Sequence, residues 1–454
     1  MNRVLRWMIA VLPLLCSSVT ASFTSPPRGH SPSPLHVRDR FLARKSDNVP
    51  VTIRGYTYMG FQNGQTAPDG LWAGGPAADT DFAYVIYQTR VLGFNAVRLP
   101  YIFHDVFDLP PKNILSQCSP SSLADLRNHT TDPGLRAPGV ARKIMSPPNT
   151  PLPQPRNGQC NAYFPASSTL DRLLWTVQKV VSEGMYCLVD YHPMGGEQTS
   201  HNPAAFVAGW TRVWRAILAL PNFESDLRGR VFLDVLNEPD SMGMAWSELG
   251  PLYLRTMDAL DAFNPDATIF FIEGTGQTGY HTNWGNGFVT DKAILSQYGL
   301  SDPNPFFAAL MNRPYLGRVV ISPHVYGPSV SGLSVGWAGD ALFTALTHSF
   351  GYLTQAGYCN STTHCHRFPT IVGEFGSKFQ DPRDLQHLDD FARWAWARDS
   401  GKDGKHQPLA GWFYWCFNPN SGDTGGLVDD TFSTYEWVKV RFLIRSMGLA
   451  PWWL

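Results

Sequence analysis

The regular alternation of short apolar runs with amphipathic stretches is the feature that most limits how this sequence can fold. A short apolar run is typical of a buried strand, and a 3.6-residue apolar period is typical of a helix. The strand-like runs are residues 51–59, 96–99, 186–190, 231–236, 268–272, 319–322, 370–372 and 411–416. The helix-like stretches are residues 79–92, 169–183, 203–219, 246–263 and 385–398.

Strands that alternate with helices in this way predict an α/β fold, the (β/α)8 TIM barrel with long βα-loop insertions. A doubly wound open sheet is the alternative, but the sequence has no Gly-rich phosphate turn to accompany it. The two longest insertions are residues 101–168, which are polar and Pro-rich, and residues 274–316. We expect both on the C-terminal face of the barrel, where the active sites of such barrels are built.

Polar and ionisable residues follow the predicted strands at the points where they end. Because the strand ends of a barrel face one funnel, we expect these side chains to converge. Two of them are carboxylates, Glu238 and Glu374, after the fourth and seventh strands. The others are Arg98, Asp190, His192, Asn237, His324, Tyr326 and Trp415.

A carboxylate pair across a barrel mouth is the arrangement that glycoside hydrolysis requires. One carboxyl group protonates the leaving oxygen, while the other attacks the sugar or activates water. A separation of about 5–5.5 Å predicts retention of configuration, and about 6.5–9.5 Å predicts inversion. A single glutamate at a strand end is more often a structural ion pair, so the prediction depends on the whole set. Glu273, at another strand end, is a candidate substrate contact.

In this order and spacing, the motifs resemble glycoside hydrolase family 5, the cellulase-type retaining hydrolases. The similarity extends from about residue 51 to residue 440. The motifs that carry it are Arg-Gly-Tyr-Thr-Tyr-Met-Gly-Phe (54–61), Gly-Leu-Trp (70–72), Asn-Ala-Val-Arg-Leu-Pro (95–100), Asp-Tyr-His (190–192), Leu-Asn-Glu-Pro (236–239), His-Val-Tyr (324–326), Gly-Glu-Phe-Gly (373–376) and Trp415.

The resemblance implies a role for each matching residue. Glu238 would be the acid/base and Glu374 the nucleophile, with Asn237 bonded to the sugar 2-hydroxyl in the −1 subsite. Arg98 and Tyr326 would keep the nucleophile ionised and oriented. The residues expected around the sugar are His192, His324 and the aromatic platforms Trp415 and Trp72.

The activity that these features predict is a retaining endo-β-1,4-glucanase acting on β-1,4-linked glucan through a covalent glycosyl-enzyme. An endo-β-mannanase and a mixed-linkage or xyloglucan-directed glucanase remain alternatives, because the catalytic residues do not distinguish these substrates. The insertion over 101–168 could either close one end of the cleft or lengthen it, so the sequence does not decide between endo and exo action. A non-catalytic glycan-binding barrel is the alternative outside the enzyme class.

The N-terminus has the pattern of a secretory signal peptide over residues 1–21. Arg3 and Arg6 precede an apolar stretch, 7–16, and small residues follow at 19–21. We therefore expect a secreted, extracellular protein. Residues 22–50 are rich in Pro and Ser and are predicted to be a flexible lead-in, followed by a catalytic domain over 51–454.

Cysteine usage agrees with an oxidising compartment. The chain has seven cysteines, and six remain after a cleaved signal peptide. We expect Cys118 to pair with Cys160 and Cys359 with Cys365. The sequence leaves open whether Cys187 and Cys416 form a disulfide or remain as two buried thiols. Two N-glycosylation sequons begin at Asn128 and Asn360.

Composition excludes several kinds of partner. The net charge is −1 and only 16% of residues are charged, which gives no electrostatic basis for binding nucleic acid or an acidic membrane. Aromatic residues make up 13% of the chain, in keeping with a neutral, flat ligand such as a sugar. The predicted chemistry needs no cofactor and no metal, and we expect a monomer.

Overall fold

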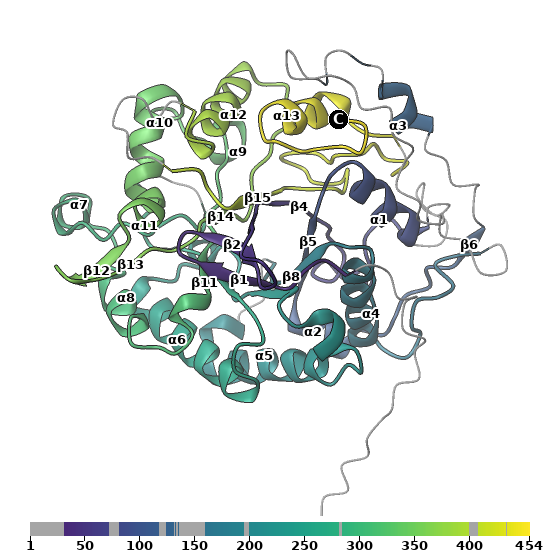
Figure 1. Ribbon diagram of the computed structural model, residues 1–454, viewed down its shortest axis with the longest axis horizontal. Helices are drawn as coiled ribbons and strands as arrows, with labels where there is room; N and C mark the ends of the chain where they lie inside the picture. The colour runs from purple at the N-terminus through teal and green to yellow at the C-terminus, as the bar shows by residue number, and fades with distance from the viewer. Residues whose placement is uncertain are drawn as a thin grey trace, which may run out of the picture.

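A barrel of parallel strands occupies the centre of the computed structural model (Figure 1). The structure describes residues 31–71, 81–117, 124–130, 132, 135, 159–194, 199–280, 284–398, 407–432 and 434–454. The strand order in the sheet is β11-β10-β9-β8-β5-β4-β15-β14. In chain order these strands are β4 (Ile53–Thr57), β5 (Ala96–Tyr101), β8 (Tyr186–Tyr191), β9 (Val231–Asp234), β10 (Phe270–Ile272), β11 (Val319–Ile321), β14 (Ile371–Val372) and β15 (Gly411–Tyr414).

The sheet closes on itself between β11 and β14. Two parallel bridges join these strands, Ile321 with Thr370 and His324 with Glu374. The amide of Val325 donates to the carbonyl of Glu374 at 2.9 Å, which extends the seam toward the C-terminal end. The closed parallel barrel confirms the predicted (β/α)8 class.

Helices form a ring around the strands, and each predicted helical stretch contains one. Asp81, Ser168, Asn202 and Asp381 cap their helices by accepting a backbone N–H in the first turn. The long helices are α1 (Phe82–Val91), α4 (Thr169–Ser182), α5 (Pro203–Leu218), α6 (Trp246–Phe263), α12 (Pro382–Ala395) and α13 (Trp437–Arg445). The shorter ones include α7 (Lys292–Tyr298), α8 (Asn304–Leu310), α9 (Pro328–Ser331), α10 (Gly339–Leu346) and α11 (Tyr352–Gln355).

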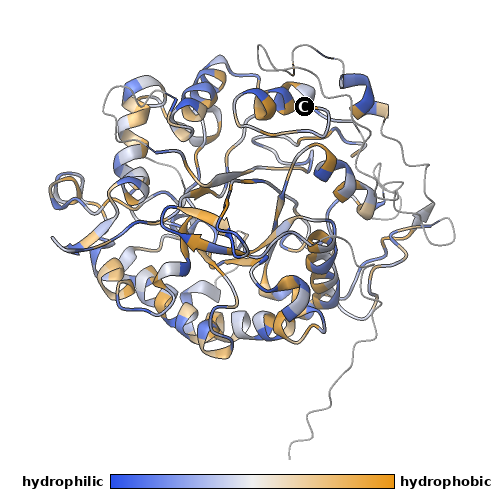
Figure 2. Ribbon diagram, in the orientation of Figure 1, coloured by the Kyte–Doolittle hydropathy of each residue, from blue (hydrophilic) through white to orange (hydrophobic). Residues whose placement is uncertain are grey.

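The helices are amphipathic, with polar and apolar residues alternating along the outer ring (Figure 2). The largest apolar core lies between strands and helices and includes Trp210 and Trp214 of α5, both fully buried. No helix among the described residues is long and apolar enough to cross a bilayer.

An N-terminal hairpin covers the bottom of the barrel, which differs from the flexible lead-in predicted over 22–50. Within the described part of that stretch, β1 (Leu35–Arg38), β2 (Phe41–Arg44) and β3 (Pro50–Val51) form an antiparallel sheet. Leu35 and Leu42 are buried in a second core with residues from the N-terminal ends of the barrel strands. Figure 1 shows β1 and β2 lying across the barrel.

The hairpin is fastened by hydrogen bonds as well as by packing. The amide of Leu35 donates to the carbonyl of Gly229 at 2.8 Å, and the Tyr186 hydroxyl donates to the carbonyl of Ser33 at 2.9 Å. Because the surrounding sequence is rich in Pro and Ser, these two four-residue strands were not predicted. The signal peptide predicted over 1–21 lies outside the described residues.

Helix α3 (Ala124–His129), in the 101–168 insertion, packs against the start of α13. The described part of this insertion also contains α2 (Phe103–Asp108), β6 (Ser116–Gln117) and β7 (Gln159–Cys160). Asp125 of α3 accepts hydrogen bonds from the Tyr435 amide and the Trp437 indole. The His129 ring stacks on Trp437 with 3.6 Å between the ring centroids.

One predicted disulfide is present and the other is only partly described. Cys359 and Cys365 are bonded across β12 (Tyr358–Ser361) and β13 (His364–His366). Cys160 is disulfide-bonded, but Cys118 lies outside the described residues, so that pairing stays a prediction. Cys187 and Cys416, left open from the sequence, are buried free thiols.

Removing side-chain volume from the hairpin should destabilise the whole barrel. The Leu42 side chain is 0% exposed, so we expect Leu42→Ala to lower the free energy of unfolding by about 2–5 kcal/mol. Val49→Ala is the control, because Val49 lies between β2 and β3 but is 45% exposed, and it should change stability by less than about 0.5 kcal/mol. Denaturant unfolding measures both, and equal small effects would contradict a structural role for the hairpin.

Candidate active site

Side chains from six strand ends meet at the C-terminal mouth of the barrel. The structure brings together all but one of the site residues predicted from the sequence. The exception is Trp72, which lies outside the described residues. The residues that converge are Arg98, His192, Asn237, Glu238, His324, Tyr326, Glu374 and Trp415.

Arg98 on β5 lies at the centre of this group and is completely buried. Its Nη2 lies 3.1 Å from Asp190 Oδ2 and 3.2 Å from Glu273 Oε1. Its Nε lies 3.3 Å from Asp234 Oδ2, and its Nη1 pairs with Glu374 Oε1. Burial alone would lower the pKa of the guanidinium, but the surrounding carboxylates outweigh it and hold that pKa well above its usual value.

Glu374 is buried directly after β14 and is held at both carboxylate oxygens. Oε1 accepts from Arg98, and Oε2 accepts from the Tyr326 hydroxyl at 2.6 Å. Two donors, one of them charged, fix the orientation of the carboxylate. The backbone bridge between Glu374 and His324 also places this residue at the seam of the barrel.

Glu238 is the more accessible carboxylate, with 20% of its side chain exposed. Its backbone is left-handed, with φ 42° and ψ 59°, a conformation that costs a non-glycine residue energy. Its amide is fastened there by donating to Glu273 Oε2 at 2.8 Å. The unusual backbone conformation turns the side chain toward the centre of the barrel mouth.

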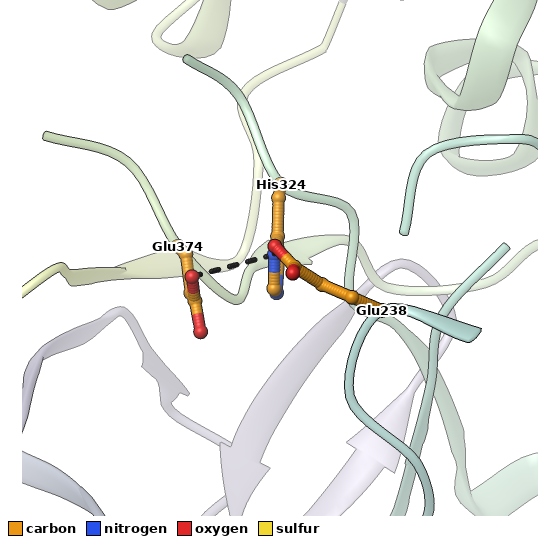
Figure 3. A group of neighbouring side chains, drawn as sticks. All are labelled: Glu238, His324 and Glu374. Carbon is orange, nitrogen blue, oxygen red and sulfur yellow. Dashed lines mark hydrogen bonds and ion pairs between the residues drawn. The ribbon is translucent and has the colours of Figure 1, made fainter. Parts of the chain in front are cut away.

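His324 lies between the two carboxylates, as Figure 3 shows. Its Nδ1 is 2.9 Å from Glu238 Oε1 and 3.4 Å from Glu374 Oε2, and its Nε2 is 3.1 Å from Glu273 Oε1. Burial lowers the pKa of His324, but the negative charges of Glu273 and Glu374 raise it well above the usual value.

The spacing of these groups suits a reaction at a single bond. One polar atom each from Glu238, His324 and Glu374 lie within 4.8 Å of one another. Three such groups are also side chains of the kind that binds a metal ion. Here, however, both ring nitrogens of His324 already face carboxylate oxygens, at 2.9 Å from Glu238 Oε1 and 3.1 Å from Glu273 Oε1. The geometry therefore fits an imidazole placed between carboxylates.

An aromatic ring and several polar side chains also belong to the group at the barrel mouth. The Trp415 ring lies parallel to the His192 ring, at 9° and 5.3 Å between centroids, and its Nε1 donates to Ser421 Oγ at 3.1 Å. His192 Nδ1 is bonded to Asp190 at 2.8 Å. Asn237 Oδ1 accepts from Arg98 Nη2 at 2.8 Å.

Three further buried carboxyl groups surround Arg98, of which the sequence singled out Asp190 and Glu273 but not Asp234. Asp190 and Asp234 pair with Arg98, and Asp234 has a pKa raised by burial to about 7. Glu273, expected as a candidate substrate contact, is completely buried and contacts Arg98, His324 and the Glu238 amide instead. Burial raises the pKa of Glu273 well above its usual range. The inward position of Asp234 on its strand was the signal that could have identified it.

A fourth carboxyl group lies two residues beyond Glu238. Asp240 accepts a hydrogen bond from the Gly285 amide at 3.2 Å. Burial, followed by the negative charge of Glu238, raises its pKa to about 7. Asp240 thereby connects the Glu238 turn to the loop that follows β10.

Comparison with known proteins gives the family that the sequence motifs resemble. The family model "Cellulase (glycosyl hydrolase family 5)" matches residues 152–421. The "Major extracellular endoglucanase" of Xanthomonas campestris is 25% identical over 419 residues, which are 88% of this chain and 68% of that protein. An "Endoglucanase" of Paenibacillus polymyxa is 26% identical over 87% of this chain and 83% of its own length.

Solved structures share the fold. An endocellulase of Pyrococcus horikoshii, solved as a variant in complex with cellotetraose, aligns with a TM-score of 0.60 and 22% identity over 92% of this chain and 100% of its own. The catalytic domain of the Xanthomonas campestris enzyme aligns with a TM-score of 0.58 and 22% identity, over 90% of this chain and 99% of its own. The match of the family model to more than half of the chain, together with these similarities, places the protein in glycosyl hydrolase family 5 as a glycoside hydrolase.

Proposed function

We propose that this protein is a secreted endo-β-1,4-glucanase that cleaves its substrate with retention of configuration. The observation that carries the proposal is the pairing of Glu238 with Glu374 across the barrel mouth, with polar atoms within 4.8 Å. That spacing is close to the roughly 5–5.5 Å at which the second carboxylate acts as a nucleophile. An inverting enzyme would need room for a water molecule between the two groups.

In the first step, Glu374 attacks the anomeric carbon and forms a covalent glycosyl ester. The bond from that carbon to the leaving oxygen breaks, and Glu238 gives its proton to the oxygen. In the second step, Glu238 removes a proton from water, and the water oxygen displaces Glu374 from the anomeric carbon. The greater exposure of Glu238 supports this assignment, because the acid/base must meet both the leaving group and water.

The remaining residues orient these two carboxylates and the sugar. Arg98 and Tyr326 hold the nucleophile in one orientation, since both donate to it. A charged His324 can donate to Glu238 in its ionised state, between the two steps. Residues proposed to contact the −1 sugar are Asn237, His192 and the platforms Trp415 and Trp72.

A neutral, flat polysaccharide is the substrate class that suits this mouth. Trp415 offers an aromatic face to the C–H face of a pyranose. The related Xanthomonas campestris and Paenibacillus polymyxa proteins are named endoglucanases, and the Pyrococcus horikoshii endocellulase was solved with cellotetraose. These similarities favour β-1,4-glucan over the mannan and xyloglucan alternatives.

Export to the extracellular space is part of the same proposal. The signal-peptide pattern over 1–21, the Cys359–Cys365 disulfide and the extracellular Xanthomonas campestris relative support it. We propose a single catalytic domain that begins at the N-terminal hairpin and acts as a monomer. The sequon residues Asn128 and Asn360 are both exposed, as N-glycosylation would require.

Polymer preference is tested by reducing-sugar release from a panel of soluble substrates. The panel contains a soluble cellulose derivative, mixed-linkage glucan, xyloglucan, mannan and xylan. We expect the highest rate on the β-1,4-glucans, because a flat glucan chain matches the aromatic platform. Highest activity on mannan would overturn the substrate assignment while leaving the mechanism in place, and no activity on any polymer would favour a glycan-binding barrel.

Neutralising either carboxylate should abolish most of the activity. We expect Glu374→Gln and Glu238→Gln each to lower kcat by about a hundredfold or more, since one removes the nucleophile and the other the proton donor. Glu224→Gln is the matched control, because the Glu224 side chain is 68% exposed and its ion pair is with a surface arginine, Arg228. Retention of activity in either site variant, with the control unchanged, would show that this pair does not carry the reaction.

The anomeric form of the first product tests the double displacement. We expect proton NMR of a fresh digest to show the β-anomer first, with the α-anomer rising only through mutarotation. Retention follows from the short separation of Glu238 and Glu374. Early accumulation of the α-anomer would instead indicate direct attack by water.

A further inference from the structure

We infer that Asp384 is a positioning residue, which holds two active-site loops so that the Tyr326 hydroxyl meets Glu374. The inference rests on the proposed function, because it concerns the carboxylate proposed as nucleophile. Asp384 lies in the first turn of α12, outside the barrel mouth, and its side chain is completely buried.

One of the two loops follows β11 and contains Tyr326. Three residues beyond Tyr326, the Ser329 amide donates to Asp384 Oδ1 at 3.0 Å. The Ser329 hydroxyl donates to Asp384 Oδ2 as well. The carboxylate therefore holds this loop through both the backbone and a side chain.

The other loop follows β14 and contains Glu374. Three residues beyond Glu374, the Ser377 hydroxyl donates to Asp384 Oδ2 at 2.6 Å. Ser377 is fixed in turn, since its Oγ accepts from the Phe379 amide at 3.0 Å and its carbonyl accepts from the Tyr414 hydroxyl at 3.4 Å. One buried carboxylate thus joins equivalent positions of the two loops.

The chain leaves room for this contact at Gly327. A Cβ atom at this position would lie 2.7 Å from Asp384 Oδ1, closer than real Cβ contacts. Gly327 has φ −74°, which any residue can adopt, so the missing side chain matters for space and not for backbone freedom. The close approach lets the carboxylate reach the loop directly behind Tyr326.

The hydrogen bonds of Asp384 to the two loops affect the distance between Tyr326 and Glu374, because those residues lie on opposite sides of the barrel seam. Their hydrogen bond, 2.6 Å long, depends on the separation of the loops after β11 and β14. The other groups that face Glu374 are Arg98, His192, His324 and Glu238, and none of them contacts Asp384 among the described interactions. The titratable and charged neighbours of Asp384 itself are Arg383 and His387, on the same helix.

A double-mutant cycle with Tyr326→Phe tests the inference. We expect Asp384→Asn to lower kcat/KM by about tenfold or more, because the loops that carry Tyr326 and Glu374 are then no longer joined and the nucleophile loses its Tyr326 donor. Tyr326→Phe should lower kcat/KM to a similar extent, and the double variant should lose no more than Tyr326→Phe alone.

Asp381→Asn is the matched control, since Asp381 lies one turn earlier and caps α12 by accepting from Arg383, a role that Asn also fills. It should leave kcat/KM unchanged. If Asp384→Asn does not fold, Ser329→Ala and Ser377→Ala replace it, because each removes one hydroxyl and keeps the carboxylate.

Additive losses of kcat/KM in the cycle would overturn the inference. A crystal structure of the Asp384 variant gives a readout independent of activity, and an unchanged Tyr326–Glu374 distance near 2.6 Å would overturn it too. An inactive wild-type protein would contradict the proposed function instead, and the crystallographic distance would still decide the role of Asp384.

Discussion

The buried guanidinium of Arg98 is the interaction on which the rest of the site depends. A charge with no solvent access is costly unless it is paired and hydrogen-bonded. Here carboxylates from β8, β9, the residue after β10 and the loop after β14 surround it, so the strands must meet in one register for the charge to be satisfied. The arginine therefore links the closure of the barrel to the placement of Glu374.

The seam between β11 and β14 also links the closure of the barrel to the position of Glu374. Few backbone bridges close the barrel there, and one of them joins His324 to Glu374. Because the two residues share a bridge, any opening of the seam would separate them. Side-chain contacts around the same point, from Tyr326 to Glu374 and from His324 to Glu238, add stability where the backbone pairing is short.

Sequence periodicity predicted the eight barrel strands and the alternation of helices, since both patterns come from the burial of one face. It also selected Glu238 and Glu374, because strand ends in a barrel share one face. It did not predict β1 and β2, whose strands are too short to stand out from Pro- and Ser-rich surroundings. Glu273 was misread because one chain position cannot reveal whether a strand-end carboxylate faces substrate or a buried arginine.

The N-terminal hairpin is synthesised first but is among the last parts of the structure to gain its contacts. Leu35 and Leu42 leave the ribosome early, yet the core that buries them includes Ile371 and Phe413, near the other end of the chain. Contacts of such long sequence separation form late in folding, since a large loop must close before they contribute. The hairpin therefore stays without its full set of partners until the last strand arrives, and any expression boundary placed after it would leave the bottom of the barrel open.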